Sequence, residues 1–345
     1  MNIGTYRPGV YSQYTVTSLY GGRRQGTRLG LVGCFGLAEP LTVQTYTPGI
    51  SAPPPGAAPL LQNLWTLCLK AGVGAVYAVS LPQGPGAGQV EEALGALDDR
   101  DVYAVALQAF GVDHAQAAAR WAAGQSAQQK ERMVFLGQTD QSAAITLAGQ
   151  LNQERVVLTL GAPGWEGQEG DALYGAAALG LAVALQEDPS VSFSNLELSA
   201  LEGVGGLSLS QCDALLEAWV SPLVPVGGHV ECLRAVTTKT RDGGVPDRSL
   251  YPINAILIID HVLRNLRGTL ASLLKGGRQG AGTLSAVGSQ VTVLLSGLRQ
   301  QGIITDYGAP YVYTPGDDPG RCVVEVSFRA AYTINQICIT AQVQL

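Results

Sequence analysis

Between residues 60 and 187, apolar runs alternate with amphipathic helical patterns, and this feature most constrains the fold. The apolar runs lie at 75–81, 101–108, 132–138 and 155–161. The helical patterns lie near 60–71, 89–97, 113–130, 141–151 and 172–187. Runs that are apolar on both sides are typical of strands buried on both faces, and strands linked through helices pair mostly in parallel. We therefore predict an α/β body with a doubly wound mixed sheet, which the run RLGLVGCFG opens at Arg28.

The pattern changes after Gly203, which predicts a second unit of α+β type. Its expected elements are a helix with a proline-stopped turn, a strand, two long helices and final strands, at 207–226, 228–238, 249–275, 282–302 and 321–345. The predicted division is an N-terminal arm at 1–27, a body domain at 28–205, a C-terminal domain at 206–330 and a C-terminal strand arm at 331–345.

Both ends of the chain carry the period-two pattern of a half-buried strand. The predicted strand residues of the two arms are Val10, Tyr11, Tyr14, Val16, Ile337, Ile339, Ala341, Val343 and Leu345. The apolar phase shifts by one residue at Asn335–Gln336, which predicts a β-bulge or bend where the last strand leaves the body. Such a strand can add to the sheet of a neighbouring subunit, and the alternative is that it closes a sheet of its own subunit.

Charged residues make up only 14% of the chain, against about a quarter in typical soluble domains. Either other protein covers much of the surface, or the chain lies in a membrane. The longest apolar run, Ala172–Gln186, is too short to span a bilayer, and the N-terminus lacks the apolar core of a signal peptide. We therefore expect an intracellular protein without direct membrane insertion, covered by partner proteins.

No motif for catalysis or nucleotide binding is present in the sequence. It contains no P-loop, GxGxxG, GxSxG or HExxH pattern. The acidic stretch 98–101 and His261 could take part in chemistry, but a solvated helix end and a packed histidine are the simpler interpretations. The six scattered cysteines have no metal-ligand spacing and are expected to be free thiols. The sequence thus predicts no catalytic residue, cofactor, metal or nucleic-acid partner.

Taken in order, several segments resemble the contractile tail sheath family of bacteriophages, R-type bacteriocins and related injection machines. They are YRPGVYSQ, RLGLVGCFG, VECLRAVTTKT, the helix pair from Leu250 to Gly302, and SFRAAYTINQICITAQVQL. The resemblance implies a non-enzymatic subunit that polymerises as hexameric rings around an inner tube protein and contracts to drive the tube through a target envelope. It also implies that the arms add strands to the C-terminal domains of neighbours.

The same resemblance implies baseplate and terminator proteins as further partners. It places the protein in a phage virion tail or a phage-tail-like particle that is assembled in the bacterial cytoplasm. The alternative function is that of a soluble α/β enzyme or ligand-binding protein with an oligomerising C-terminal strand.

The distribution of charge suggests one further contact. The net charge is +4 over residues 1–30, −14 over 31–233 and +5 over 234–278. Arg264 and Arg267 share a helical face at i, i+3 spacing, with Lys275 and Arg278 beyond them. We predict that this basic strip meets acidic surface on the inner tube or on a neighbouring body, and the alternative is a solvated helix face.

Overall fold

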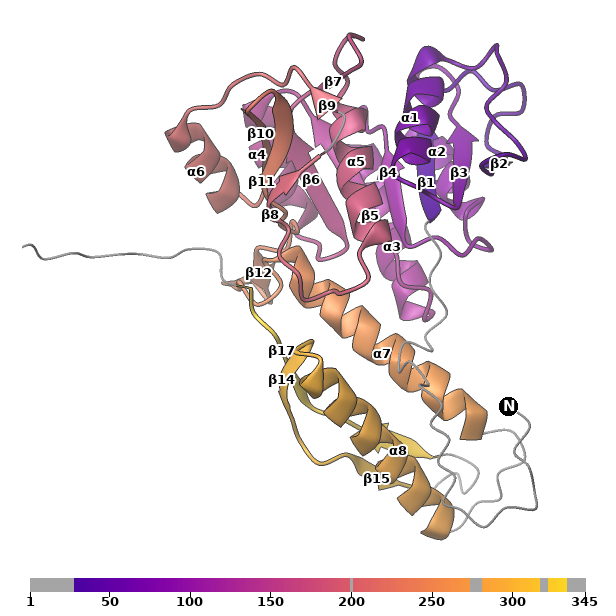
Figure 1. The fold of residues 1–345 in the computed structure, drawn as a ribbon, viewed down its shortest axis with the longest axis vertical. Coiled ribbons are helices and arrows are strands. Elements are labelled where there is room, and N and C mark those ends of the chain that lie inside the picture. Colours follow the sequence, from indigo (N-terminus) through magenta and orange to yellow (C-terminus); the bar gives the residue numbers. More distant parts are fainter. Residues whose placement is uncertain (1–27, 199–200, 274–280, 317–321, 334–345) are drawn as a thin grey trace, which may run out of the picture.

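The computed structural model describes residues 28–198, 201–273, 281–316 and 322–333. A wide sheet forms one end of the elongated molecule, and two long helices lead away from it (Figure 1). The strand order is β2 (Val43–Tyr46), β3 (Ala75–Ser80), β1 (Arg28–Gly33), β4 (Ala104–Leu107), β5 (Met133–Gln138), β6 (Val156–Leu160), β10 (Ser221–Val226), β11 (His229–Arg234) and β8 (Ser194–Glu197). The six strands from β3 to β10 are parallel, while β2, β11 and β8 are antiparallel to their neighbours.

Helices cover both faces of this sheet. The first face carries α1 (Pro59–Lys70) and α5 (Ala172–Leu185), and the second carries α2 (Ala87–Gly95), α3 (Val112–Ala127), α4 (Gln141–Leu151) and α6 (Leu209–Glu217). Alternate residues of β1 enter different cores: Leu29 and Leu31 pack with α1 and α5, whereas Val32 packs with the second set. The predicted fold class, a doubly wound mixed sheet with a further α+β part, is therefore confirmed.

A glycine permits close contact between α5 and the sheet. A Cβ atom built on Gly137 of β5 would lie 2.1 Å from the backbone oxygen of Ala172, the first residue of α5. Asp171 precedes this helix and accepts a hydrogen bond of 2.7 Å from the Leu173 N–H, which satisfies one of the free donors at the helix start.

The predicted turn at the end of 207–226 is wrong. Residues 221–226 form strand β10, and β10 and β11 continue the main sheet although they lie beyond the predicted domain boundary at 205/206. Strand β10 tolerates Pro225 because its pairing with the parallel strand β6 ends at Pro222, so Pro225 has no partner on that side. The segment up to Arg234 therefore packs with the body.

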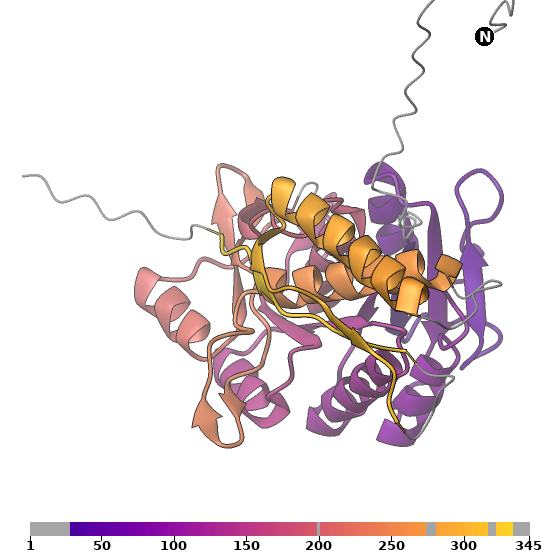
Figure 2. The same cartoon turned by 90° about the horizontal axis from the view of Figure 1, so that it is seen from below.

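The remaining described elements form the C-terminal unit and two small ribbons. The C-terminal unit consists of α7 (Ile253–Leu273), α8 (Ala281–Gln300), β14 (Ile304–Tyr307), β15 (Tyr311–Tyr313), β16 (Val323–Glu325) and β17 (Phe328–Ala330). Strands β7 (Gly164–Trp165) and β9 (Leu201–Glu202) pair with each other, as do β12 (Arg241–Asp242) and β13 (Val245–Pro246). Figure 2, seen from below, shows α7 and α8, both orange, lying together in front of the sheet.

Helix α7 belongs to two hydrophobic cores. Ile253, Ile256 and Leu257 pack in the core between the sheet, α1 and α5. Ile258, directly after Leu257, and Val262, one turn further on, pack with α8 and the last strands. The body and the C-terminal unit are therefore joined by one continuous helix.

Candidate functional site

The C-terminal unit ends in a two-stranded antiparallel ribbon, the first candidate for an assembly site. Strands β14 and β15 form one side of it, and β16 and β17 form the other. Ile304 lies opposite Ala330, and the Gly308 N–H donates to the Ser327 carbonyl over 2.9 Å, which joins the two halves. Within the described residues each of these strands pairs with one other strand. Each outer edge therefore presents backbone groups that a further strand could pair with.

The helices stabilise one face of the ribbon. Ile304 is 1% exposed and packs in the core of Val291 and Leu295 of α8, with Phe328 partly buried against it. Tyr311 is 61% exposed on the ribbon. A two-stranded ribbon is only marginally stable by itself, so support from α8 and the addition of further strands both favour it.

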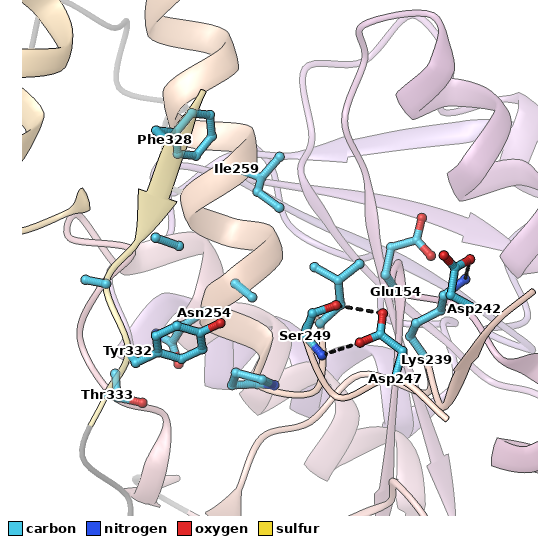
Figure 3. A pocket seen from close by; sticks show the side chains of 15 residues that line it. Glu154, Lys239, Asp242, Asp247, Ser249, Asn254, Ile259, Phe328, Tyr332 and Thr333 are labelled. Atoms are coloured by element: carbon cyan, nitrogen blue, oxygen red, sulfur yellow. Dashed lines mark hydrogen bonds and ion pairs between the residues drawn. The ribbon is translucent and has the colours of Figure 1, made fainter. Parts of the chain in front are cut away.

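A groove of about 630 Å³ lies between the end of the ribbon and the body (Figure 3). Ala255 and Ile259 of α7 contribute to its apolar floor. One wall is the ribbon end, from Phe328 to Thr333, and the opposite wall is formed by Glu154 and residues between Lys239 and Leu250. Figure 3 shows the two walls facing each other across the start of α7.

The wall opposite the ribbon carries most of the groove's charge. Its carboxylates are those of Glu154, Asp242 and Asp247, and its one ammonium group, Lys239, lies 3.9 Å from Asp242. The Asp247 carboxylate accepts hydrogen bonds from the Ser249 backbone N–H over 2.9 Å and from its hydroxyl over 2.7 Å. These hydrogen bonds lower the pKa of Asp247, so it is charged at neutral pH. The side chains of this wall that line the groove are therefore net negative, while Arg241 and Arg248 of the same segment lie outside the lining.

Asn152 fixes the position of this wall. The residue caps α4 in the left-handed conformation at φ 41°, which asparagine tolerates better than most residues. Its side-chain oxygen accepts from the backbone N–H groups of Thr240 and Arg241 over 2.8 and 2.9 Å. The β12–β13 hairpin is thereby tied to the body.

A buried charge cluster joins α7 to the amino-terminal ends of strands β4 and β6. Asp260 of α7 is 1% exposed, and its carboxylate accepts two hydrogen bonds from Arg155, one of them 2.9 Å long. The Tyr103 hydroxyl donates to the same carboxylate over 2.7 Å. Burial and the Asp260 charge raise the pKa of Tyr103 well above its ordinary value, so the hydroxyl keeps its proton.

Arg264 and Arg267, from the predicted basic strip, lie beside this cluster. Both form ion pairs with Glu131 of the same chain, and the Arg264 Nε lies 3.0 Å from the Glu131 carboxylate. The Arg264 guanidinium also stacks 4.4 Å from the centre of the Tyr103 ring. Their side chains are still 26% and 33% exposed, so the contact with a tube or neighbour stays a prediction.

The other predicted interface residues lie outside the described part of the chain. These are Lys275 and Arg278 of the basic strip, and Val10, Tyr11, Tyr14, Val16, Ile337, Ile339, Ala341, Val343 and Leu345 of the two arms. The expected bulge at Asn335–Gln336 falls there as well.

Hydrogen bonds between the chain's own groups cross the crevice in which doubly wound sheets bind ligands. It lies between the carboxyl ends of β1 and β4, whose connections go to opposite faces of the sheet. The Gln108 side chain reaches across this gap and accepts a hydrogen bond of 2.9 Å from the Cys34 N–H. Beside it, the Ser80 hydroxyl accepts from the Phe35 N–H over 3.2 Å.

The acidic stretch 98–101 interacts with neighbouring side chains. Asp98 accepts from the Trp121 indole over 2.8 Å, and Asp101 pairs with Arg28. In the described ranges no group of three His, Cys, Asp or Glu side chains has metal-site geometry. The five cysteines found there are free, while Cys338 lies outside them. No described helix is both long and apolar enough to cross a membrane.

Sequence reasoning did not find Glu131, Arg155 or Tyr103 as parts of the α7 contact. Asp260 offered a signal, because it interrupts the apolar sequence AILIIDHVL, and a charge in such a position requires a buried partner. The partners themselves lie 105 to 157 residues away along the chain and carry no comparable pattern.

Comparison with solved structures identifies the fold. No protein-family model and no curated protein sequence matches the chain. A chain in the cryo-EM structure of the contracted helical sheath of the anti-feeding prophage superposes with a TM-score of 0.69 at 16% identity, covering 98% of this chain and 99% of that one. A chain of the six-fold symmetrised baseplate structure of the same prophage gives 0.71 at 15% identity, with 99% and 100% covered. The sheath tail protein of Desulfitobacterium hafniense gives 0.65 at 10% identity, with 93% and 100% covered. The chain therefore has the fold of contractile sheath proteins over nearly its whole length.

Proposed function

We propose that this chain is a structural subunit of a contractile tail sheath. In the proposed assembly, subunits form hexameric rings stacked around an inner tube protein, and contraction of the stack drives the tube through a target envelope. The observation that carries the proposal is the match over 98% of the chain to a subunit of a contracted helical sheath. This match includes the C-terminal unit with its open ribbon.

The ribbon supports a specific way of connecting subunits. Each of its outer edges can pair with an added strand, and the sequence supplies one strand pattern near each end of the chain. We propose that arms from neighbouring subunits pair with these edges, so that the rings stay connected while the bodies move.

The likeness to chains of phage-tail-like prophage particles supports the proposed setting. The subunit would assemble in the bacterial cytoplasm into a phage tail or phage-tail-like particle, with baseplate and terminator proteins at the ends of the stack. It would have no catalytic role. The alternative is a soluble α/β enzyme or ligand-binding protein with an oligomerising C-terminal strand, and the hydrogen bond from the Cys34 N–H to Gln108 across the usual ligand crevice disfavours it.

Removal of residues 337–345 tests the proposal. The purified full chain should form tubes or stacked rings in electron micrographs, whereas the truncated chain should stay folded by circular dichroism but sediment as small species. The full chain forming only discrete small oligomers would contradict the sheath function.

A pair of substitutions sharpens this test. Ile339→Asp places a charge on the apolar face of the terminal strand pattern and should prevent assembly almost as strongly as the deletion. Thr340→Asp places the same charge on the polar face and should assemble. If the deletion unfolds the chain instead, the terminal strand belongs to its own subunit's core.

A further inference from the structure

A second cavity, of about 720 Å³, lies where α7 meets two loops at the amino-terminal ends of β4 and β5. One loop contributes residues 98–101, the other contributes residues 129–132, and α7 contributes Arg264 and Arg267. We call this space the arginine cavity. It is separate from the groove of Figure 3, because the two have no lining residue in common.

Arg132 is a buried cation in the lining of this cavity. The residue is 3% exposed, and its guanidinium donates to the backbone carbonyls of Val102 and Arg100, the second over 2.6 Å. Among the described residues, its Nε has no acceptor and no carboxylate forms an ion pair with it. Buried charges in folded proteins are normally paired, so an anionic group that reaches Arg132 stabilises the folded chain.

The four carboxylates that line the cavity have other partners. Asp99, Asp101 and Glu131 each form an ion pair with a basic side chain other than Arg132. The fourth, Asp98, accepts a hydrogen bond of 2.8 Å from the Trp121 indole. The negative charges of the lining are therefore already matched.

Positive charge is in excess around the cavity. Five basic side chains line it, those of Arg100, Lys130, Arg132, Arg264 and Arg267. Arg28 adds a sixth from outside the lining, through its ion pair with Asp101. Six positive charges against four carboxylates leave an excess of two. A dianion balances this excess, whereas a single carboxylate balances half of it.

We propose that the arginine cavity binds a phosphate group, which takes Arg132 as its buried contact and the cationic side chains of Lys130 and α7 as its other contacts. Arginine suits this role, because its guanidinium is weakly hydrated and its donors match the spacing of phosphate oxygens. The bound phosphate connects both loops of the body with α7. The inference goes beyond the proposed sheath function and does not depend on it.

Equilibrium dialysis of the full chain against radiolabelled inorganic phosphate tests the inference, with sodium chloride holding the ionic strength constant. The wild type should bind one phosphate per chain and saturate. Arg132→Gln should raise the Kd about tenfold, which corresponds to about 1.4 kcal/mol. Lys130→Gln should raise it about fivefold or more. Lys70→Gln is the matched control and should leave the Kd unchanged, because Lys70 also pairs with a carboxylate and is 52% exposed, against 44% for Lys130, but lies outside the cavity.

Urea unfolding gives a second readout. Phosphate at ten times its Kd should raise the apparent folding equilibrium constant of the wild type about elevenfold. Phosphate also strengthens apolar burial in any protein. The rise is therefore compared with that in Arg132→Gln, where a tenfold weaker Kd predicts only about a twofold change. Equal rises in the two chains would overturn the inference.

Competition against the labelled phosphate identifies the source of the phosphate group. Equal displacement by pyrophosphate and by a nucleoside diphosphate supports a site for inorganic phosphate. Displacement by the nucleoside diphosphate at lower concentrations supports a site for the phosphates of a nucleotide. Displacement by acetate at the same concentrations as phosphate would overturn the inference in favour of a carboxylate.

The remaining outcomes also decide the question. Binding that does not saturate, or an unchanged Kd in Lys130→Gln, would overturn the phosphate site. If Arg132→Gln does not fold by circular dichroism, Arg267→Gln replaces it, because Arg267 is partly exposed and lines the same cavity. It should raise the Kd by about as much as Lys130→Gln does, and an unchanged Kd would overturn the site. The sheath function is tested separately by electron microscopy, so failure of the phosphate site leaves it intact.

Discussion

At the scale of single residues, the contact between α7 and the body is an exchange of buried charges. Helix α7 provides Asp260 to Arg155 of the body, and the body provides Glu131 to Arg264 and Arg267 of the helix. Buried ion pairs contribute little net stability compared with apolar packing, but breaking one is costly. Their effect here is to fix the register of α7, since a shift of one residue would leave both carboxylates without a partner.

Glu131 should make stability depend on pH. Burial alone would raise the pKa of Glu131, but hydrogen bonds from its own backbone N–H and from Arg267 and Arg264 outweigh burial and lower the pKa below its ordinary value of 4.5. A lowered folded-state pKa means that the contribution is present above the ordinary pKa and is lost as the pH falls through the folded-state value.

We expect Glu131→Gln to cost about 1–3 kcal/mol at neutral pH, because two hydrogen bonds to a charged acceptor are weakened. Urea unfolding measured at several pH values should show less loss of stability on acidification below about pH 4.5 than in the wild type. Glu92→Gln, at an exposed position of α2, is the control. Equal pH dependence in wild type and Glu131→Gln would contradict this account.

At the scale of elements, the hydrophobic cores of both units depend on α7, which contributes side chains to each of them. Its first turn packs in the body core and its middle packs with α8, so neither core can form completely without the same helix. Its 21 residues span about 32 Å, enough to reach from the sheet to the ribbon. The two units should therefore unfold together.

Leu295→Ala tests this coupling from the C-terminal side. Leu295 of α8 is fully buried, so its truncation should cost about 2–5 kcal/mol. Tryptophan fluorescence reports on the body, where Trp65 and Trp165 are buried, and should follow the same lowered transition as far-UV circular dichroism. Val293→Ala on the same helix, at a position 59% exposed, should change stability by less than about 0.5 kcal/mol. A body transition unchanged by Leu295→Ala would show that the units unfold separately.

At the scale of the whole molecule, the uneven charge distribution is partly neutralised within the subunit. Reversal of Arg264 and Arg267 to glutamate would test their contact with a tube or neighbour only if it left the fold intact. With Glu131 buried between them, reversal would instead gather three carboxylates at one place and destabilise the α7 contact. Neutral substitutions at these positions are the better probe of contacts with a tube or neighbour.

Salt should act more strongly on assembly than on folding. Raising ionic strength from about 0.15 M to about 1 M shortens the screening length from about 8 Å to about 3 Å, which weakens exposed contacts between subunits more than buried pairs. We expect the rate of contraction and the sedimented fraction of polymer to change over this range, with a smaller change in the urea midpoint. A sodium chloride series is suitable, because sulfate would also strengthen apolar burial. A urea midpoint that shifts as much as assembly does would contradict this expectation.

The positions of the long, periodic elements can be predicted from the pattern of apolar residues. The run at 132–138 became β5 at Met133–Gln138, and the pattern near 141–151 became α4 at Gln141–Leu151. Periodicity predicts such elements because the spacing of apolar residues along the sequence indicates whether one face or both faces are buried. Strands such as β14 and β15 span four and three residues, too few for a period to emerge, and sequence analysis missed them.

Which elements share a core, and which charged side chains meet, depends on packing in three dimensions and is not predictable from local sequence. The local pattern predicted a proline-stopped turn at the end of 207–226, but Ser221 and Pro222 pair with the edge of β6 and extend the sheet. Glu131 and Arg264 lie 133 residues apart along the chain, and the sequence around neither residue indicates that the two form an ion pair. The groove beside the ribbon likewise arises where α7, the β12–β13 hairpin and β17 come together. Apolar periodicity indicates which face of a helix or strand is buried. The residues that this face contacts depend on how the layers pack in three dimensions.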